Sequence, residues 1–114
     1  ISSTTNTTIA GNIVGLDAAG TAVLGNGLNG IRVSDSASNT QIGTNGDGLA
    51  DADERNVISG NGNHGIEIVG NTSGTTVAGN YIGTDISGTV DLGNLGSGVG
   101  PNANRYGCQR HGRC

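Results

Sequence analysis

Residues 7–31 are TTIAGNIVGLDAAGTAVLGNGLNGI, and residues 75–99 are TTVAGNYIGTDISGTVDLGNLGSGV. The two stretches are offset by 68 positions and share 13 identical residues. Part of the pattern also occurs between them, because a Gly-Asn pair followed by Gly-Ile or Gly-Val recurs at 25–31, 60–66 and 93–99. The steps between these three copies are 35 and 33 residues. A repeat of this length predicts a solenoid built from stacked turns of the chain.

Each repeat holds short runs of Ile and Val that Gly and Asn separate. Residues 31–33 and 66–68 alternate most clearly, with Ile or Val on one face and a charged residue on the other. No stretch has the apolar spacing of a helix. Another register is also open, in which NVISGN (56–61) stacks on TTVAGN (75–80). We expect three sets of extended segments, and the members of each set should stack on one another. The first set is 9–15, 41–43 and 77–83. The second is 22–24, 56–59 and 90–92, and the third is 30–33, 65–69 and 98–99.

Stacking brings equivalent residues of successive turns to about 4.8 Å from one another. Asn26, Asn61 and Asn94 should therefore form a ladder of amide side chains. Arg32 and Glu67 are 35 residues apart, so they should pair between adjacent turns, where an exposed ion pair contributes about 0–1 kcal/mol. The residues expected to point inward are Ile9, Ile31, Ile42, Ile58, Ile66, Ile68 and Val77.

Four phrases resemble the repeats of right-handed parallel β-helix proteins that bacteria secrete or display on their surface: NVISGN (56–61), GIEI (65–68), GNYIGTD (79–85) and GTVDLGN (88–94). The resemblance covers residues 7 to about 100. It implies an all-β, right-handed parallel β-helix of about three coils with roughly 34 residues in each. It implies no particular activity, because such repeats occur in structural, adhesive and carbohydrate-active proteins. We expect the β-helix to span residues 1–103 and a separate tail to span 104–114.

Composition and charge narrow the function classes. The 114 residues suit one domain, and they include 23 Gly and no Phe, Trp or Met. No apolar run reaches the roughly 18 residues of a membrane span. Residues 1–103 hold all nine acids and two arginines, a net charge of −7, which excludes nucleic acid as the expected partner. Because the sequence shows neither an initiating Met nor a leader, we expect it to be a mature chain or a fragment.

Residues 44–55, TNGDGLADADER, match much of the calcium-loop pattern D-x-[DN]-x-D-G-x-x-D-x-x-E. Clustered carboxylates beside a Gly turn supply the six to eight oxygen ligands that calcium prefers. Gly43 occupies the first position, where such loops carry Asp, so an ordinary solvated acidic loop with Asx turns is the alternative. No other cofactor is expected. The candidate ligands are the side chains of Asn45, Asp47, Asp51 and Glu54 and the main-chain carbonyl of Leu49.

The remaining acids do not suggest a catalytic site. Asp17 and Asp85 recur at equivalent places and precede a Gly by three residues, which predicts a turn. Asp35, Glu67 and Asp91 fall on different segments, and the chain has no Lys. Enzymes that cleave polysaccharides need grouped carboxylates. We therefore expect no enzyme and keep a fragment of a polysaccharide lyase or hydrolase as an alternative.

The tail, NRYGCQRHGRC (104–114), departs from the repeat. Cys108, His111 and Cys114 are one ligand short of a usual zinc site. In a secreted protein, a Cys108–Cys114 disulfide is the expected arrangement. Pairing between chains or an added tail are the alternatives. The tail carries a positive charge through Arg105, Arg110 and Arg113.

A three-coil solenoid exposes strand edges at both ends, and such edges recruit other chains. A negative body and a positive tail suit head-to-tail contact between copies. We therefore expect a non-catalytic structural subunit, outside the cell or on its surface, that stacks end to end into a filament or surface layer through the tail arginines. The alternative is a module that binds a carbohydrate or a cell surface.

Overall fold

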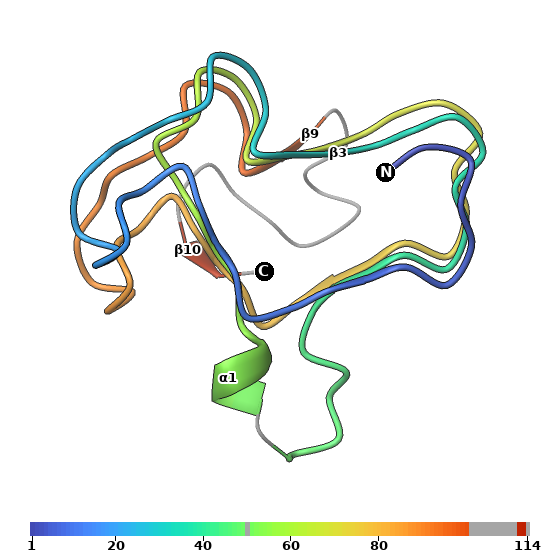
Figure 1. The fold of residues 1–114 in the computed structure, drawn as a ribbon, viewed down its shortest axis with the longest axis horizontal. Coiled ribbons are helices and arrows are strands. Elements are labelled where there is room, and N and C mark those ends of the chain that lie inside the picture. The colour runs from blue at the N-terminus through green and yellow to red at the C-terminus, as the bar shows by residue number, and fades with distance from the viewer. Residues whose placement is uncertain (50, 101–111, 114) are drawn as a thin grey trace.

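The computed structural model describes residues 1–49, 51–100 and 112–113, the last two by their backbone alone. Three successive passes of the chain lie one on another (Figure 1), and we call them coil 1 (1–34), coil 2 (35–69) and coil 3 (70–100). A short helix, α1 (Asp51–Glu54), interrupts coil 2. The strands are β1 (Thr8–Ile9), β2 (Ile13–Val14), β3 (Ile31–Val33), β4 (Gln41–Gly43), β5 (Val57–Ile58), β6 (Ile66–Ile68), β7 (Thr76–Ala78), β8 (Tyr81–Ile82), β9 (Val99–Gly100) and β10 (Gly112–Arg113).

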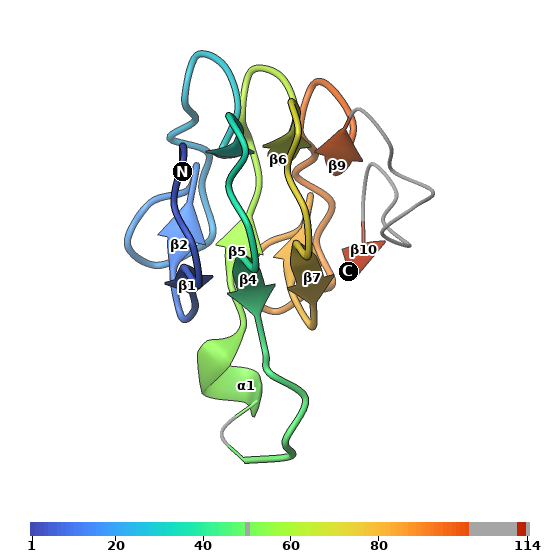
Figure 2. The same cartoon turned by 90° about the vertical axis from the view of Figure 1, so that its right-hand side faces the viewer.

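Each coil contributes one strand to each of three sheets (Figure 2). The sheets are β1-β4-β7, β2-β5-β8 and β3-β6-β9, and every pair within these sets is parallel. Parallel pairs need long crossover connections, and here one whole coil provides each crossover. The fold is an all-β, parallel, solenoid-like arrangement. Among the described residues no helix is long and apolar enough to cross a membrane.

The single extended segment expected at 9–15 is wrong, because the chain turns a corner between β1 and β2. Gly11 has a φ of +73° at this corner, and Gly79 has a φ of +69° at the equivalent corner between β7 and β8. Glycine adopts such positive values without the steric cost that a Cβ brings. Residues 9–15 and 77–83 therefore each supply strands to two different sheets.

The expected stacking of 56–59 is also wrong. Val57 pairs with Ile13 and with Tyr81, not with residues 22–24 and 90–92. The alternative register for NVISGN fails too, because Val57 and its partner Tyr81 are 24 positions apart. The physical reason is an insertion in coil 2 between β4 and β5, which shifts the spacing while the two-coil offset stays at 68.

A core of stacked aliphatic side chains fills the space between the sheets. Six of the seven predicted inward residues are buried there, and Ile9 is partly buried and packs against the same core. A second, smaller cluster lies apart from it and contains Leu16, Val57 and Tyr81, with Leu92 packed against it. The main core consists of Ile31, Val33, Ala37, Ile42, Ile58, Ile66, Ile68, Val77, Ile82 and Val99.

Two ladders of asparagine amides run along the stack. In the predicted ladder, Asn26 Nδ2 donates to Asn61 Oδ1 at 2.9 Å and Asn61 Nδ2 donates to Asn94 Oδ1 at 3.0 Å. These bonds confirm the ladder expected from the repeat. A second ladder, which the sequence analysis missed, joins Asn12, Asn56 and Asn80 through bonds of 3.2 and 3.0 Å. The first Asn of NVISGN could have indicated this ladder, but the register expected for residues 56–59 stacked it on other residues.

Candidate functional site

The inserted loop of coil 2 is the part of the molecule with the clearest site chemistry. Two to three residues separate β1 from β2 and β7 from β8, whereas residues 44–56 separate β4 from β5. The loop therefore projects from one corner of the stack, with α1 on its returning arm (Figures 1 and 2). Four acids, all within 47–54, lie on this projection.

Side chains within the loop hold it in shape. Asn45 Oδ1 accepts from Asp47 N at 3.0 Å, and Asp47 Oδ1 accepts from Leu49 N at 2.7 Å, which are two successive Asx turns. Thr44 Oγ1 donates to Asp51 Oδ1 at 2.7 Å. Glu54 Oε2 accepts from Asn45 N at 3.1 Å and ties α1 to the start of the loop. The Asx turns expected for a plain acidic loop are thus present together with the calcium-loop spacing.

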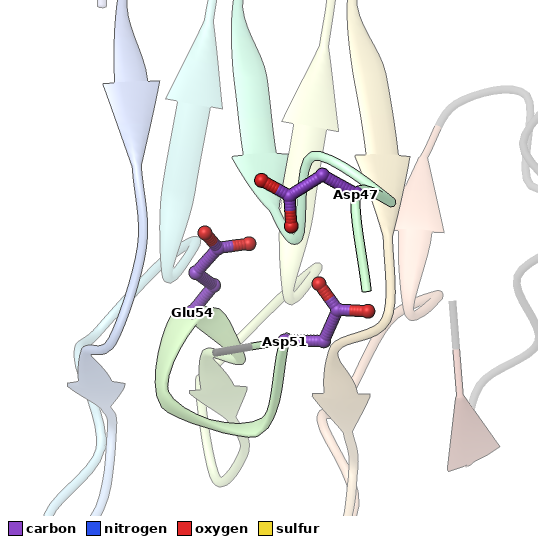
Figure 3. A group of neighbouring side chains, drawn as sticks. All are labelled: Asp47, Asp51 and Glu54. Carbon is purple, nitrogen blue, oxygen red and sulfur yellow. The ribbon is translucent and has the colours of Figure 1, made fainter. Parts of the chain in front are cut away.

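Three carboxylates converge inside this loop (Figure 3). One oxygen from each of Asp47, Asp51 and Glu54 can be chosen so that all lie within 4.8 Å of one another. Calcium binds oxygen at 2.3–2.6 Å, so ligands on opposite sides of one ion lie about 5 Å apart. The spacing is therefore compatible with a shared cation.

No described basic side chain neutralises these acids. Arg32–Glu67 is the only ion pair within the described residues. The nearest arginine in sequence, Arg55, instead lies over the Tyr81 ring at 4.1 Å from its centroid and donates from Nε to Gly79 O at 3.1 Å. Converging carboxylates without a basic partner repel one another in the absence of a cation.

The structure brings together three of the five predicted ligands. Asp47, Asp51 and Glu54 form the cluster, and Asp53, on the same helix, is not part of it. Asn45 contributes its side-chain oxygen to the Asp47 turn. Leu49, whose carbonyl was the fifth candidate, has an exposed side chain and donates its N–H to Asp47.

Asp17 and Asp85 lie in turns, as predicted. Asp17 Oδ1 accepts from Thr21 N at 3.0 Å, and these backbone donors hold the pKa of Asp17 below its usual value. Asp85 Oδ1 accepts from the hydroxyl of Ser87 at 2.5 Å and from its N–H at 3.0 Å. The Ser87 hydroxyl is the main cause that lowers the pKa of Asp85.

The other acids have local structural partners. Asp35 accepts from the Ser2 and Ser34 hydroxyls at 2.8 and 2.9 Å, which lowers its pKa. Arg32 Nε lies 3.0 Å from Glu67 Oε2, so the predicted pair between adjacent coils is confirmed. Asp91 lies opposite Thr84 in an antiparallel bridge. Within the described residues these three acids do not form a group.

His64, for which no role is predicted from the sequence, connects two coils. Its Nδ1 accepts from Ser97 N at 3.0 Å. A Cβ at Gly96 or Gly100 would come within 2.8 Å of the imidazole ring, so the ring packs closely against these two glycines of coil 3. The glycines opposite His64 were the only available signal for this contact.

A groove lies between two loops that coils 1 and 3 have and coil 2 lacks. Coils 1 and 3 carry loops at 16–24 and 84–92, and Ile86 N donates to Gly20 O at 2.9 Å between them. Coil 2 has no such loop at this corner, which leaves a groove of about 440 Å³ over Gly60, with Val23 and Asp91 among its lining residues. None of the described residues that line the groove is aromatic.

The two ends of the stack differ. At the end formed by coil 3, β10 pairs antiparallel with β8, with Gly112 opposite Ile82 and Arg113 opposite Tyr81. The other predicted tail residues, Cys108, Cys114, Arg105 and Arg110, lie outside the described residues. Residues 112–113 therefore lie against their own coil 3.

Coil 1 presents strand edges at the opposite end. No strand in the described part of the chain pairs with the outer side of β1, β2 or β3. Val57 N donates to Asn12 O and Ser59 N donates to Val14 O. Because alternate residues of a strand direct their peptide groups to opposite sides, the N–H and C=O of Ile13 face away from coil 2. Gln41 N donates to Thr7 O, so the same holds for Thr8 in β1.

Comparison with known proteins gives no further identification. No family model matches the chain, and no curated protein and no solved structure is significantly similar to it. The function is therefore inferred from the geometry of this molecule.

Proposed function

We propose that this chain is a non-catalytic structural module that acts outside the cell by end-to-end association. In this proposal it is a right-handed parallel β-helix of about three coils with roughly 34 residues each. The observation that carries the proposal is the outer edge of coil 1, with which no strand of the described residues pairs. An edge of this kind is a template for another chain unless bulges, charges or covering segments block it.

The chemistry of the coil 1 edge supports association. The Ile13 side chain is 36% exposed there, whereas its partners in coils 2 and 3, Val57 and Tyr81, are buried. Coil 1 also carries little charge, since Asp17 and Arg32 offset each other. Coil 2 has six acids and one arginine, a net charge of −5. Association through coil 1 therefore brings two copies together at the least charged part of an acidic molecule.

Sedimentation velocity over a range of concentrations tests this proposal. We expect the sedimentation coefficient to rise with concentration and the Ile13→Lys variant to remain monomeric, because a charge on an edge opposes strand pairing. Val90→Lys is the matched control, since Val90 is a half-exposed apolar residue in the loop of coil 3. A wild-type chain that stays monomeric at the highest concentration would contradict the proposal.

A second proposed activity is calcium binding by the inserted loop. The convergence of Asp47, Asp51 and Glu54 within 4.8 Å, without a described basic partner, favours it. The ion would connect the start of the loop to α1 and thereby stabilise the corner of coil 2. A ligand that binds only the folded state at 100 times its Kd stabilises that state by about 2.7 kcal/mol.

Thermal unfolding with millimolar calcium and with a chelator tests calcium binding. We expect calcium to raise the Tm of the wild-type chain and to have no effect on Asp51→Asn. Asp53→Asn is the control, because it removes the same charge from the same helix outside the cluster. An equal response of both variants, or no response of the wild type, would identify the loop as ordinary acidic surface.

A further inference from the structure

The differences between the two ends of the molecule decide which form of association it can adopt. A head-to-tail filament would add coil 1 of one copy to coil 3 of the next and would extend all three parallel sheets. That joint needs the outer edges of β7, β8 and β9 to be open at the same time, because the three strands of coil 1 would pair with them together as one coil. The edge of β8 is already paired with β10. Head-to-tail addition is therefore obstructed at one of the three sheets.

Within residues 1–49, 51–100 and 112–113, no strand obstructs the outer edge of β1 in the same way. The outer edge of β3 is occupied at one point, because the Ile1 amine donates to Arg32 O at 2.8 Å. Beyond β2, the chain enters the loop at 16–24. By contrast, β1 is preceded by polar residues, and the Thr8 side chain is exposed. The β1 edge is the most accessible pairing edge of coil 1.

We propose that two copies of this chain join head to head through coil 1, with β1 of one copy antiparallel to β1 of the other across a two-fold axis. This inference rests on the proposed end-to-end association. It specifies that the partner is a second copy of the chain and that the assembly contains two copies. The outward N–H and C=O of Thr8 supply one donor and one acceptor. In an antiparallel pair, two such residues exchange both hydrogen bonds. A two-fold contact uses the same surface on both copies and is closed, so assembly stops at a dimer.

Charge also suits this joint. The net charge of residues 1–34 is zero for side chains, because they contain one Asp and one Arg. The acidic loop projects sideways from the corner of the stack (Figure 2), where Gly11 N of coil 1 donates to Glu54 O at 3.1 Å. The antiparallel pairing of β10 with β8 shows that a terminal edge of this stack accepts an antiparallel strand.

Sedimentation equilibrium of the 114-residue chain and two threonine variants tests the inference. Thr8 and Thr76 align in one column through Gln41, and both are exposed, but Thr8 lies on coil 1 and Thr76 on coil 3. We expect the wild type, 11.2 kDa per chain, to reach twice that mass and no more. We expect Thr8→Lys to raise the dimer Kd at least about tenfold and Thr76→Lys to leave it unchanged.

The possible failures separate the two proposals. Species larger than a dimer that grow with concentration and are weakened by Thr76→Lys would overturn the two-fold joint and leave end-to-end association intact. A monomeric wild type would overturn both proposals. Circular dichroism checks that the variants fold, and Ile13→Lys replaces Thr8→Lys if the latter does not. A dimer that Thr8→Lys and Ile13→Lys both leave unchanged would overturn the coil 1 contact.

Discussion

Buried asparagine side chains fix the register of the coils at the scale of single residues. Asn61 is 1% exposed, and its amide accepts from the side chain of Asn26 and donates to that of Asn94. Its N–H also donates to Asn94 Oδ1 at 3.0 Å. A shift of one residue between coils would break all of these bonds and leave buried amide groups unpaired, which costs about 1–3 kcal/mol for each group.

Asn61→Ala should therefore destabilise the fold more than Asn26→Ala does. The first change removes a buried side chain that accepts from Asn26 and donates to Asn94, so two hydrogen bonds within the stack are lost, and we expect a loss of about 2–3 kcal/mol in the free energy of unfolding. The second change is at the exposed end of the ladder, where water can replace the lost donor, and should cost less than about 1 kcal/mol. Urea unfolding measures both values. Equal losses would show that the ladder does not depend on burial.

The first ladder could be predicted from the sequence because its three asparagines recur within the repeat. The second could not, because the insertion at 44–56 places Asn56 44 positions from Asn12 and 24 from Asn80. The contact of His64 with Ser97 was missed for another reason. It depends on two glycines that leave room for the ring, and glycine is too frequent in this chain to single them out.

At the scale of elements, the loops of alternate coils are stabilised by their own carboxylates. Asp85 accepts from Ser87 and, at 3.4 Å, from Val90 N within the loop of coil 3. These donors lower the pKa of Asp85 in the folded chain. Ionised Asp85 therefore stabilises the fold above the pKa of the unfolded chain, about 3.9. This contribution is lost as the pH falls through the lower, folded-state pKa.

We expect Asp85→Asn to reduce the acid sensitivity of the fold. The wild-type urea midpoint should fall as the pH is lowered from about 5 to 2, and the variant should lose part of that fall, because an amide oxygen accepts hydrogen bonds at every pH. Asp53→Asn is the control, since the exposed Asp53 side chain accepts no hydrogen bond from a described residue. Identical pH profiles for Asp85→Asn and the wild type would contradict this role.

The acidic loop shows which elements a sequence can predict. Its spacing is local, so Asp47, Asp51 and Glu54 could be grouped without knowledge of the fold, and the structure brings them together. Strand pairing is different, because β5 finds partners 44 and 24 positions away. These two unequal spacings cannot be derived from the average repeat of roughly 34 residues. The repeat predicted the coils, and the insertion concealed the register of one sheet.

At the scale of the whole molecule, the stack has two unlike ends. The tail was expected to contact the next copy, yet the part of it that the structure describes pairs with β8 of its own coil 3. No spacing in the sequence indicates that pairing, because residues 112–113 lie outside the repeat. The consequence is that coil 1, rather than the tail, carries the proposed contact between copies.

The central claim is that the outer edge of coil 1 is open in a single molecule and closed by a second copy. Residue-resolved amide hydrogen exchange at increasing protein concentration tests it most directly. Val57 N and Tyr81 N donate within the stack at 2.8 and 2.9 Å and should exchange slowly at every concentration. The amides of Thr8 and Ile13 should exchange fast in dilute solution, and that of Thr8 should become protected as the concentration rises. Protection of Thr8 that is already complete in dilute solution, or absent at the highest concentration, would contradict the account.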